Sequence, residues 1–132
     1  MYLIDTDVLI WVLRGNQSYL ELLSNLRNET VLAISTLTIA EIYKNILPIE
    51  ITRTEALFTQ FKLYPVTDHI ARSGGLYWKQ YAPRFKTLHI FDCLIAATAK
   101  EHNTVLVTLN RKHFPMKDIQ LFNWVGTKKK IN

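Results

Sequence analysis

Cysteine, glycine and long apolar runs are all scarce in this chain of 132 residues. Cys93 is the only cysteine, so no disulfide can form within the chain, and its apolar neighbours predict a buried, inert thiol. The four glycines form no glycine-rich loop after a predicted strand, which disfavours a small nucleotide-binding domain. No apolar run reaches the roughly eighteen residues of a membrane-spanning helix, and Asp5 and Asp7 stand where an export signal would be basic and then apolar. We therefore expect a cytoplasmic protein that is neither exported nor inserted into a membrane.

The remaining composition favours one compact domain with a basic surface. Hydrophobic residues make up 48% of the chain, which is enough for a sizeable core in a single domain of this length. We place this domain at residues 1–126 and a basic, mobile tail at residues 127–132, which contain three consecutive lysines. The formal charge of +5 and the pI near 9.4 favour a polyanionic partner such as nucleic acid, although a lysine-rich surface also serves solubility.

Strand-like and helix-like segments alternate along the chain. Short β-branched or apolar runs predict strands at residues 2–4, 31–34 and 104–109, with a weaker candidate at 119–122. Apolar residues at helical spacing predict helices around residues 19–26, 39–46 and 54–61. Two further helices are expected at residues 90–102 and at residues 67–81, the latter with Ile70, Ala71, Trp78 and Tyr81 facing inward. This alternation predicts an α/β domain with a mostly parallel central sheet between helices.

Three acids stand next to apolar segments that are far apart in the sequence. Asp5 follows the first predicted strand, Glu41 lies in an amphipathic helix, and Asp92 opens the apolar helix. Each has a simpler role available, because Asp5 can cap a helix, Glu41 can be a solvated residue, and Asp92 can favour the helix dipole. If these simpler roles were the whole explanation, three unrelated acids would lie by coincidence at the edge of the sheet where α/β folds gather ligands. Thr38 shares a helix face with Glu41 and can orient its carboxylate.

A cluster of carboxylates suits divalent-metal chemistry on phosphate esters. Mg²⁺ and Mn²⁺ prefer oxygen ligands and retain waters, so one or two carboxylates per ion suffice. Such an ion turns its water into a better nucleophile and neutralises charge that builds on the phosphate. Without the ion, crowded carboxylates repel one another, which raises their pKa values and costs stability. The sequence therefore predicts Asp5, Glu41 and Asp92 as catalytic residues and ligands of Mg²⁺ or Mn²⁺.

Four ordered motifs span nearly the whole chain, at residues 3–9, 35–41, 92–99 and 107–114. They read Leu-Ile-Asp-Thr-Asp-Val-Leu, Ser-x-x-Thr-x-x-Glu, Asp-Cys-Leu-Ile-Ala-Ala-Thr-Ala and Val-Thr-Leu-Asn-Arg-Lys-His-Phe. In this order they are similar to the motifs of PIN-domain ribonucleases, in particular VapC-type toxins of toxin–antitoxin pairs. The resemblance implies a three-layer α/β/α PIN-like domain and a metal-dependent endoribonuclease of a type II toxin–antitoxin system, which hydrolyses RNA phosphodiesters with a metal-activated water. It also implies a cognate antitoxin bound over the active-site groove, and a homodimer.

The resemblance assigns roles to individual positions of this chain. Asp5, Glu41 and Asp92 match the first three family acids, while Thr6 and Thr38 match polar positions that commonly support them. We therefore expect the negative charge of the site to come from the acids of the first three motifs.

The fourth motif departs from the family pattern. Many members carry an acid where this chain has His113, between Asn110 and the following phenylalanine. A neutral imidazole can bind a metal or accept a proton, but it adds no negative charge, so one ion would be held firmly and a second only with substrate phosphate. The alternatives are that His113 is a surface loop residue and that Asn110 hydrogen-bonds the backbone turn or a water on the metal.

Basic residues for RNA binding are expected at one stretch of the chain. Arg72, Lys79, Arg84 and Lys86 are candidate phosphate contacts, with Tyr77, Trp78 and Tyr81 nearby for base stacking. At helical spacing the aromatic residues can equally belong to the core or to a dimer interface, and the basic residues can be a solvated face.

Two classes of function remain open from the sequence. The first is a metal-dependent ribonuclease toxin, and the second is a catalytically weak PIN-fold module that binds RNA or an antitoxin. The imidazole at position 113 keeps the second class open, because it leaves the site short of one negative charge.

Overall fold

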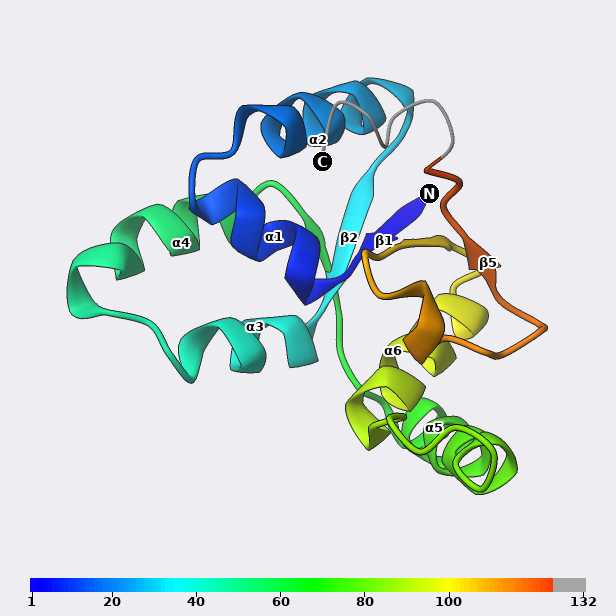
Figure 1. Ribbon diagram of the computed structural model, residues 1–132. Helices are drawn as coiled ribbons and strands as arrows, with labels where there is room; N and C mark the ends of the chain where they lie inside the picture. Colours follow the sequence, from blue (N-terminus) through cyan, green and yellow to red (C-terminus); the bar gives the residue numbers. More distant parts are fainter. Residues whose placement is uncertain (125–132) are drawn as a thin grey trace.

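The computed structural model describes residues 1–124, and five parallel strands form its centre (Figure 1). The strands are β1 (Tyr2–Ile4), β2 (Leu32–Ser35), β3 (Lys62–Tyr64), β4 (Val105–Val107) and β5 (Gln120–Leu121). They lie in the order β3-β2-β1-β4-β5, which confirms the expected parallel sheet. β3 was not expected, because it is an edge strand whose Lys62 and Leu63 are exposed and therefore give no apolar run.

Within residues 1–124, six helices connect and cover the strands. They are α1 (Thr6–Leu13), α2 (Gln17–Glu29), α3 (Thr36–Tyr43), α4 (Ile51–Phe58), α5 (Asp68–Tyr81) and α6 (Ile90–Glu101), with short 3₁₀ turns η1 (Pro48–Glu50) and η2 (Arg111–His113). The helices expected from apolar spacing are all present, with ends shifted by a few residues. α1 was not expected, because its sequence is apolar on nearly every side and shows no helical stripe.

Side chains of the central strands alternate between two cores, one on each face of the sheet. Leu3, Ala33 and Leu106 contribute to the core beneath α5 and α6, which also buries Cys93. Their neighbours Ile4 and Val107 belong to the opposite core with α1 and α2. This arrangement confirms the three-layer α/β/α architecture, and the layers are visible in Figure 1. Burial raises the pKa of the Cys93 thiol to about 11, which fits the expected inert cysteine.

The inward face of α5 differs from the expected one. Ile70 and Tyr81 are buried as expected, but Ala71 and Trp78 are exposed, and Tyr77 is buried in their place. The reason is Gly74, which lies so close to α6 that an added Cβ would stand 2.6 Å from the Leu94 side chain. This close contact brings the glycine side of α5 against α6, and the predictions for Ala71 and Trp78 were wrong.

Two further expectations concern the ends and the surface of the chain. The boundary at residue 126 and the basic tail at residues 127–132 both lie outside the described residues. Within residues 1–124, no helix has the length and apolar character needed to cross a bilayer.

Candidate active site

The strand order reverses at the centre of the sheet, between β1 and β4. From β1 the chain runs outward through β2 to β3, and it then returns to place β4 on the other side of β1. In parallel α/β sheets, the crevice beyond the carboxyl ends of the strands at such a point is the usual ligand site. Asp5 follows β1 directly, and its N–H donates to the carbonyl of Val107 at the end of β4 at 2.9 Å.

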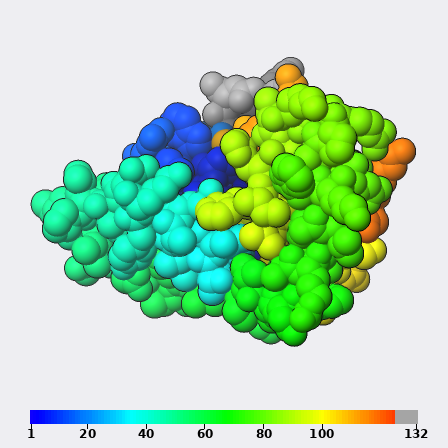
Figure 2. Space-filling model, turned by 90° about the horizontal axis from the view of Figure 1, so that it is seen from below, coloured from blue at the N-terminus to red at the C-terminus, as the bar shows by residue number. Residues whose placement is uncertain are grey.

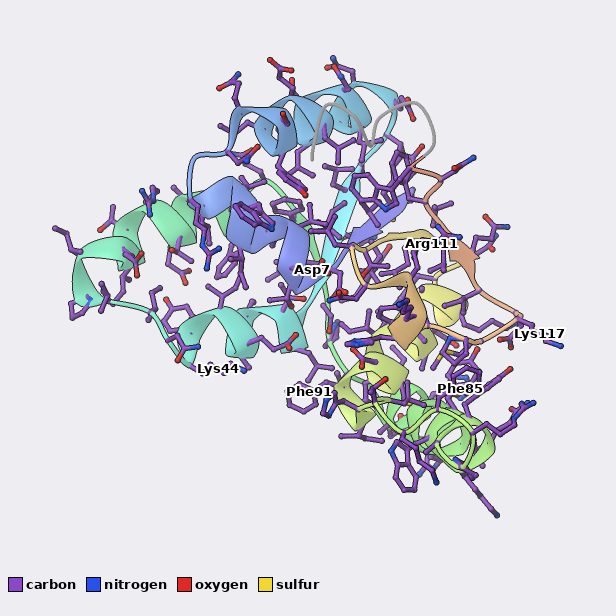
Figure 3. The ribbon with its side chains drawn as sticks, in the orientation of Figure 1. Asp7, Lys44, Phe85, Phe91, Arg111 and Lys117 are labelled. Carbon is purple, nitrogen blue, oxygen red and sulfur yellow. The ribbon has the colours of Figure 1, made fainter. Side chains whose placement is uncertain are left out.

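An open cavity of about 440 Å³ lies at this point. Four carboxylates line it, from Asp5, Asp7, Glu41 and Asp92. Its other polar or charged lining residues include Thr6, Lys44, His89, Asn110 and His113. In Figure 2 the dark blue α1 is recessed between the cyan α3 and the yellow-green start of α6, and Figure 3 shows Asp7 at the inner end of this gap. The structure thus brings together the three predicted acids and a fourth.

Asp5 is the most buried of the four acids, with 9% of its surface exposed. It caps the start of α1, where its Oδ1 accepts from the Thr6 N–H at 2.9 Å. Its Oδ2 accepts from the Thr108 hydroxyl at 2.8 Å. Burial first, and then the negative charge of Asp7, raise the pKa of Asp5 to about 7, because two hydrogen bonds only partly replace the lost water. Asp5 therefore fulfils the capping role and also presents a carboxyl group that a cation would stabilise.

Asp7 was not among the predicted site residues. Its Oδ2 accepts from the backbone N–H of Leu109 at 3.1 Å and from the Asn110 side-chain amide at 3.0 Å. Its Oδ1 is buried and has no hydrogen-bond partner among residues 1–124. Burial raises the pKa of Asp7 to about 6, against the opposing effect of the Leu109 N–H. The signal in the sequence was the pair of acids at positions 5 and 7, which places one carboxylate at the cap and one in the first turn of the same helix.

Glu41 is held by the hydroxyl groups of α1 and α3. The Thr6 Oγ1 lies 2.6 Å from the Glu41 Oε1 and 3.2 Å from the Thr38 Oγ1. Because a hydroxyl has one hydrogen, Thr6 donates to the carboxylate and is free to accept from Thr38, which is fully buried. Thr38 therefore orients Glu41 through Thr6 and makes no direct bond to it, which refines the predicted role.

Asp92 lies in the first turn of α6, as its sequence position predicted. Its Oδ2 accepts from the His89 backbone N–H at 3.3 Å, and the His113 Nδ1 lies 3.5 Å from the same oxygen. Burial raises the pKa of Asp92, while the His89 N–H and the two imidazoles act in the opposite direction. The helix-capping role and a place in the cavity are thus compatible, and Asp92 has both.

The fourth motif closes the cavity on the β4 side. His113 ends η2 beside Asp92 and lines the cavity, with a third of its side chain exposed. The backbone N–H of Asn110 donates to the Thr108 hydroxyl at 3.1 Å, so the backbone of Asn110, and not its side chain, makes the hydrogen bond within the turn. Its side chain donates to Asp7, so this amide holds the turn against α1.

The predicted RNA-binding residues do not line this cavity. Arg72 pairs with Asp68 on the same helix, and Arg84 lies over the Tyr81 and Phe85 rings. Lys86 lines a separate hollow at the end of α5, and Lys79 lies in the last turn of that helix. Phosphate binding by these four residues stays a prediction.

The aromatic residues of α5 have different surroundings from those proposed for base stacking. Tyr77 and Tyr81 are buried, and the Tyr77 hydroxyl donates to Asp118 at 2.8 Å, so neither ring can receive a base. Trp78 is 48% exposed but lies outside the acid cavity. The core role is therefore correct for the two tyrosines.

The donor set fits a hard divalent cation. No three carboxylate, imidazole or thiol side chains of residues 1–124 stand close enough to hold one ion without help. Mg²⁺ and Mn²⁺ do not need that, because they retain waters and bind through one or two carboxylates. The orphaned Asp7 Oδ1, and the raised pKa values of Asp5 and Asp7, are the features that a cation would relieve.

Comparisons with known proteins agree with the motif resemblance. The PIN domain family model matches residues 2–119. The chain is 37% identical over 116 residues to Ribonuclease VapC10 of Mycobacterium tuberculosis, an alignment that covers 88% of this chain and 87% of the relative. It is 36% identical over 117 residues to Ribonuclease VapC19 of the same organism, with coverage of 88% and 94%.

Solved structures share the fold at lower identity. The VapBC2 complex of Rickettsia felis, bound to a DNA fragment from its promoter, contains a chain that matches with a TM-score of 0.82 and 22% identity. That match covers 93% of this chain and 98% of the other. VapBC-1 of nontypeable Haemophilus influenzae matches with a TM-score of 0.77 and 24% identity, covering 94% and 98%. At these identities the likeness shows the fold.

Proposed function

The chain belongs to the PIN-domain family, and on that premise we propose that it is a metal-dependent endoribonuclease, the toxin of a type II toxin–antitoxin pair. The observation that carries the proposal is the convergence of four carboxylates, from three different helices and the end of β1, in one open cavity. Two relatives at 36–37% identity bear the name ribonuclease, which supports RNA as the substrate. The basic net charge of the chain suits a polyanionic substrate.

The site residues divide into those that would hold Mg²⁺ or Mn²⁺ and those that hold the ligands. Asp5, Asp92 and Glu41 are the proposed ligands, of which one or two would bind the cation directly and the rest through its waters, with substrate oxygens completing its shell. When bound, the ion supplies positive charge for the phosphate oxygens and acidifies a water molecule for attack. Thr108 fixes the Asp5 carboxylate and Thr6 fixes that of Glu41, so both are oriented before substrate arrives.

His113 sets the charge of the site on the Asp92 side. It contacts the carboxylate at 3.5 Å and brings no negative charge of its own. One firmly bound ion is therefore the proposed stoichiometry, with a second ion recruited only together with substrate phosphate.

An antitoxin that covers the active site is the proposed protein partner. The solved neighbours include complexes described as toxin–antitoxin pairs, which supports this assignment. A second cavity of about 280 Å³ lies between α1, α3 and α4 and shares Ile10 and Glu41 with the acid cavity. A peptide segment seated there would reach Glu41, and the groove offers it charges of both signs, because Arg14 and Arg53 lie there with Glu41 and Glu50.

A homodimer is the second proposed assembly. Leu47, Ile49 and Ile51 are 58%, 89% and 38% exposed around η1, at the tip of the hairpin between α3 and α4. Apolar side chains exposed together are typical of protein contacts. Light scattering of the purified chain, alone and after Ile49→Glu, tests whether this tip joins two copies.

We place the enzyme in the cytoplasm, where its RNA substrates and a reducing environment suited to its single thiol are found.

RNA cleavage by the purified chain tests the central proposal. In Mn²⁺, wild type should cut single-stranded RNA internally, while Asp5→Asn and Asp92→Asn should leave it intact and still melt cooperatively. Asp68→Asn is the matched control, because this acid is 81% exposed and lies outside the cavity. In cells, expression of wild type should arrest growth and expression of Asp5→Asn should not.

The catalytically weak binding module makes a different prediction. In that case wild type would bind RNA but leave diverse RNAs intact in Mn²⁺, and Asp5→Asn would bind them with unchanged affinity. The two results together, intact RNA in the presence of wild type and unchanged affinity of Asp5→Asn, would overturn the enzymatic proposal.

A further inference from the structure

Two cavity residues, Lys44 and Phe91, have no part in holding the carboxylates. Both line the acid cavity, Lys44 from the end of α3 and Phe91 from the first turn of α6 (Figure 3). Neither residue was selected from the sequence. They therefore reach the lining of the cavity from two different helices, α3 and α6.

Lys44 is the single lysine or arginine that borders the acid cavity within the described chain. None of the ion pairs among residues 1–124 engages its ammonium group. An RNA strand that approaches four carboxylates meets strong repulsion between negative charges, which a cation at the rim reduces. Lys44 is placed to bind a phosphate next to the one that is cut.

Phe91 is an apolar side chain in an unexpected place. It immediately precedes Asp92, yet it turns away from the core of α6 and is 43% exposed. Neighbouring Ile90 is 44% exposed and lines the same cavity, so the rim is apolar where the floor is charged. The Phe91 ring pairs with no other aromatic ring in residues 1–124, so no aromatic neighbour in this part of the chain takes the place that a base would occupy. In Figure 3 the ring projects into the gap between α6 and α3.

We propose that Lys44 and Phe91 form a nucleotide subsite beside the reacting phosphate. Phe91 stacks on an unpaired base and Lys44 binds the phosphate of an adjoining nucleotide. Proteins hold single-stranded nucleic acid with this combination of a cation and an aromatic ring. Stacking requires a base that is free of its pairing partner, so the subsite selects unpaired positions, and purines over pyrimidines because of their larger ring surface. The assignment rests on the proposed ribonuclease function and adds its substrate-positioning residues.

Binding measurements in an Asp5→Asn background test the subsite without cleavage. The probe is fluorescein-labelled single-stranded oligoadenylate of about 12 nucleotides, compared with a ribose–phosphate chain of equal length that lacks bases. Phe91→Ala and Phe91→Leu should weaken oligoadenylate binding about 10-fold, the effect of losing one stacked base, and leave binding of the base-free chain unchanged. Phe85→Ala is the matched control, because this ring is 37% exposed and lies outside the acid cavity.

Lys44 is tested with the same two probes. Lys44→Gln should weaken both probes and lower the slope of log affinity against log salt by about 0.7, as expected for one phosphate contact on a single strand. Lys44→Arg should restore both quantities. Lys117→Gln removes an equal charge from an exposed position away from the cavity, as Figure 3 shows, and should leave the slope unchanged.

The possible results separate the subsite from the enzymatic proposal. Equal binding of oligoadenylate by the Phe91 variants and their background, or equal losses for both probes, would overturn the stacking role. A salt slope unchanged by Lys44→Gln would overturn the phosphate role. Failure of the proposed function would instead appear as intact RNA after incubation with wild type in Mn²⁺. The binding measurements do not depend on cleavage.

Discussion

Cation binding should stabilise this protein at alkaline pH and have little effect at acid pH. Burial and the neighbouring Asp7 raise the pKa of Asp5 to about 7 in the folded chain, against an ordinary value of 3.8. Between these values the folded state binds more protons than the unfolded state, so the free energy of unfolding falls as the pH rises through this window. From about pH 5 to about pH 8, Asp5 alone accounts for a loss of about 3 kcal/mol.

A divalent cation removes this loss, because it replaces the proton that the ionised site has given up. At about 100 times its Kd, an ion bound only to the folded chain adds about 2.7 kcal/mol. For a domain of this size that is a rise in Tm of about 10 °C. The rise should be full at about pH 8, where Asp5 and Asp7 are ionised, and largely absent at about pH 5, where both are protonated.

Differential scanning calorimetry with and without Mn²⁺ at both pH values measures the effect. Asp5→Asn is the control, because asparagine keeps the helix cap and a partner for Thr108 but carries no charge. This variant should flatten the pH dependence, exceed wild type in stability at about pH 8, and lose most of the Mn²⁺ response. A Tm that rises equally with Mn²⁺ at both pH values, or wild type less stable than Asp5→Asn at about pH 5, would refute the reasoning.

Three further changes probe individual contacts. Gly74→Ala should lower the free energy of unfolding, measured in urea, by about 1–2 kcal/mol, because the new Cβ would stand 2.6 Å from the Leu94 side chain and 3.2 Å from the Leu94 Cα. Unchanged stability would mean that α5 and α6 separate at no cost. Thr108→Val should lower the free energy of unfolding by about 2 kcal/mol at alkaline pH, because it removes the hydroxyl that donates to ionised Asp5. The loss should be clearly smaller at acid pH, where Asp5 is protonated. Equal losses at the two pH values in chemical denaturation would contradict this contact. His113→Asp should tighten Mn²⁺ binding about 10-fold, because it adds a carboxylate at the cavity wall. Calorimetric titration measures this affinity, and weaker binding by the variant would show that the imidazole itself is a ligand.

Much of the fold was predictable because burial leaves a strong mark on the sequence. The central strands β1, β2 and β4 are apolar on both faces, and most helices show a one-sided apolar stripe. The two misses have opposite causes. Edge strand β3 is too exposed to form an apolar run, and α1 is too apolar to show a stripe.

The site was predictable where a residue follows a strand or opens a helix. Asp5 and Asp92 occupy such positions, and the parallel sheet brings them to the same crevice. Asp7 was missed because an acid in a first helical turn has a sufficient local explanation in the helix dipole. Lys44 was missed because its position depends on how the end of α3 faces α6, and no local pattern specifies this arrangement.

The hydrogen bond from Thr108 to Asp5 joins positions that are 103 residues apart. A ribosome therefore synthesises the first, second and third acidic motifs before the strand that pairs with β1 on its other side. Until β4 pairs with β1, both hydrophobic cores lack the side chains of β4 and the crevice has only one wall. Nascent chains and prematurely terminated products accordingly lack a complete cavity, and only a nearly finished polypeptide can assemble one.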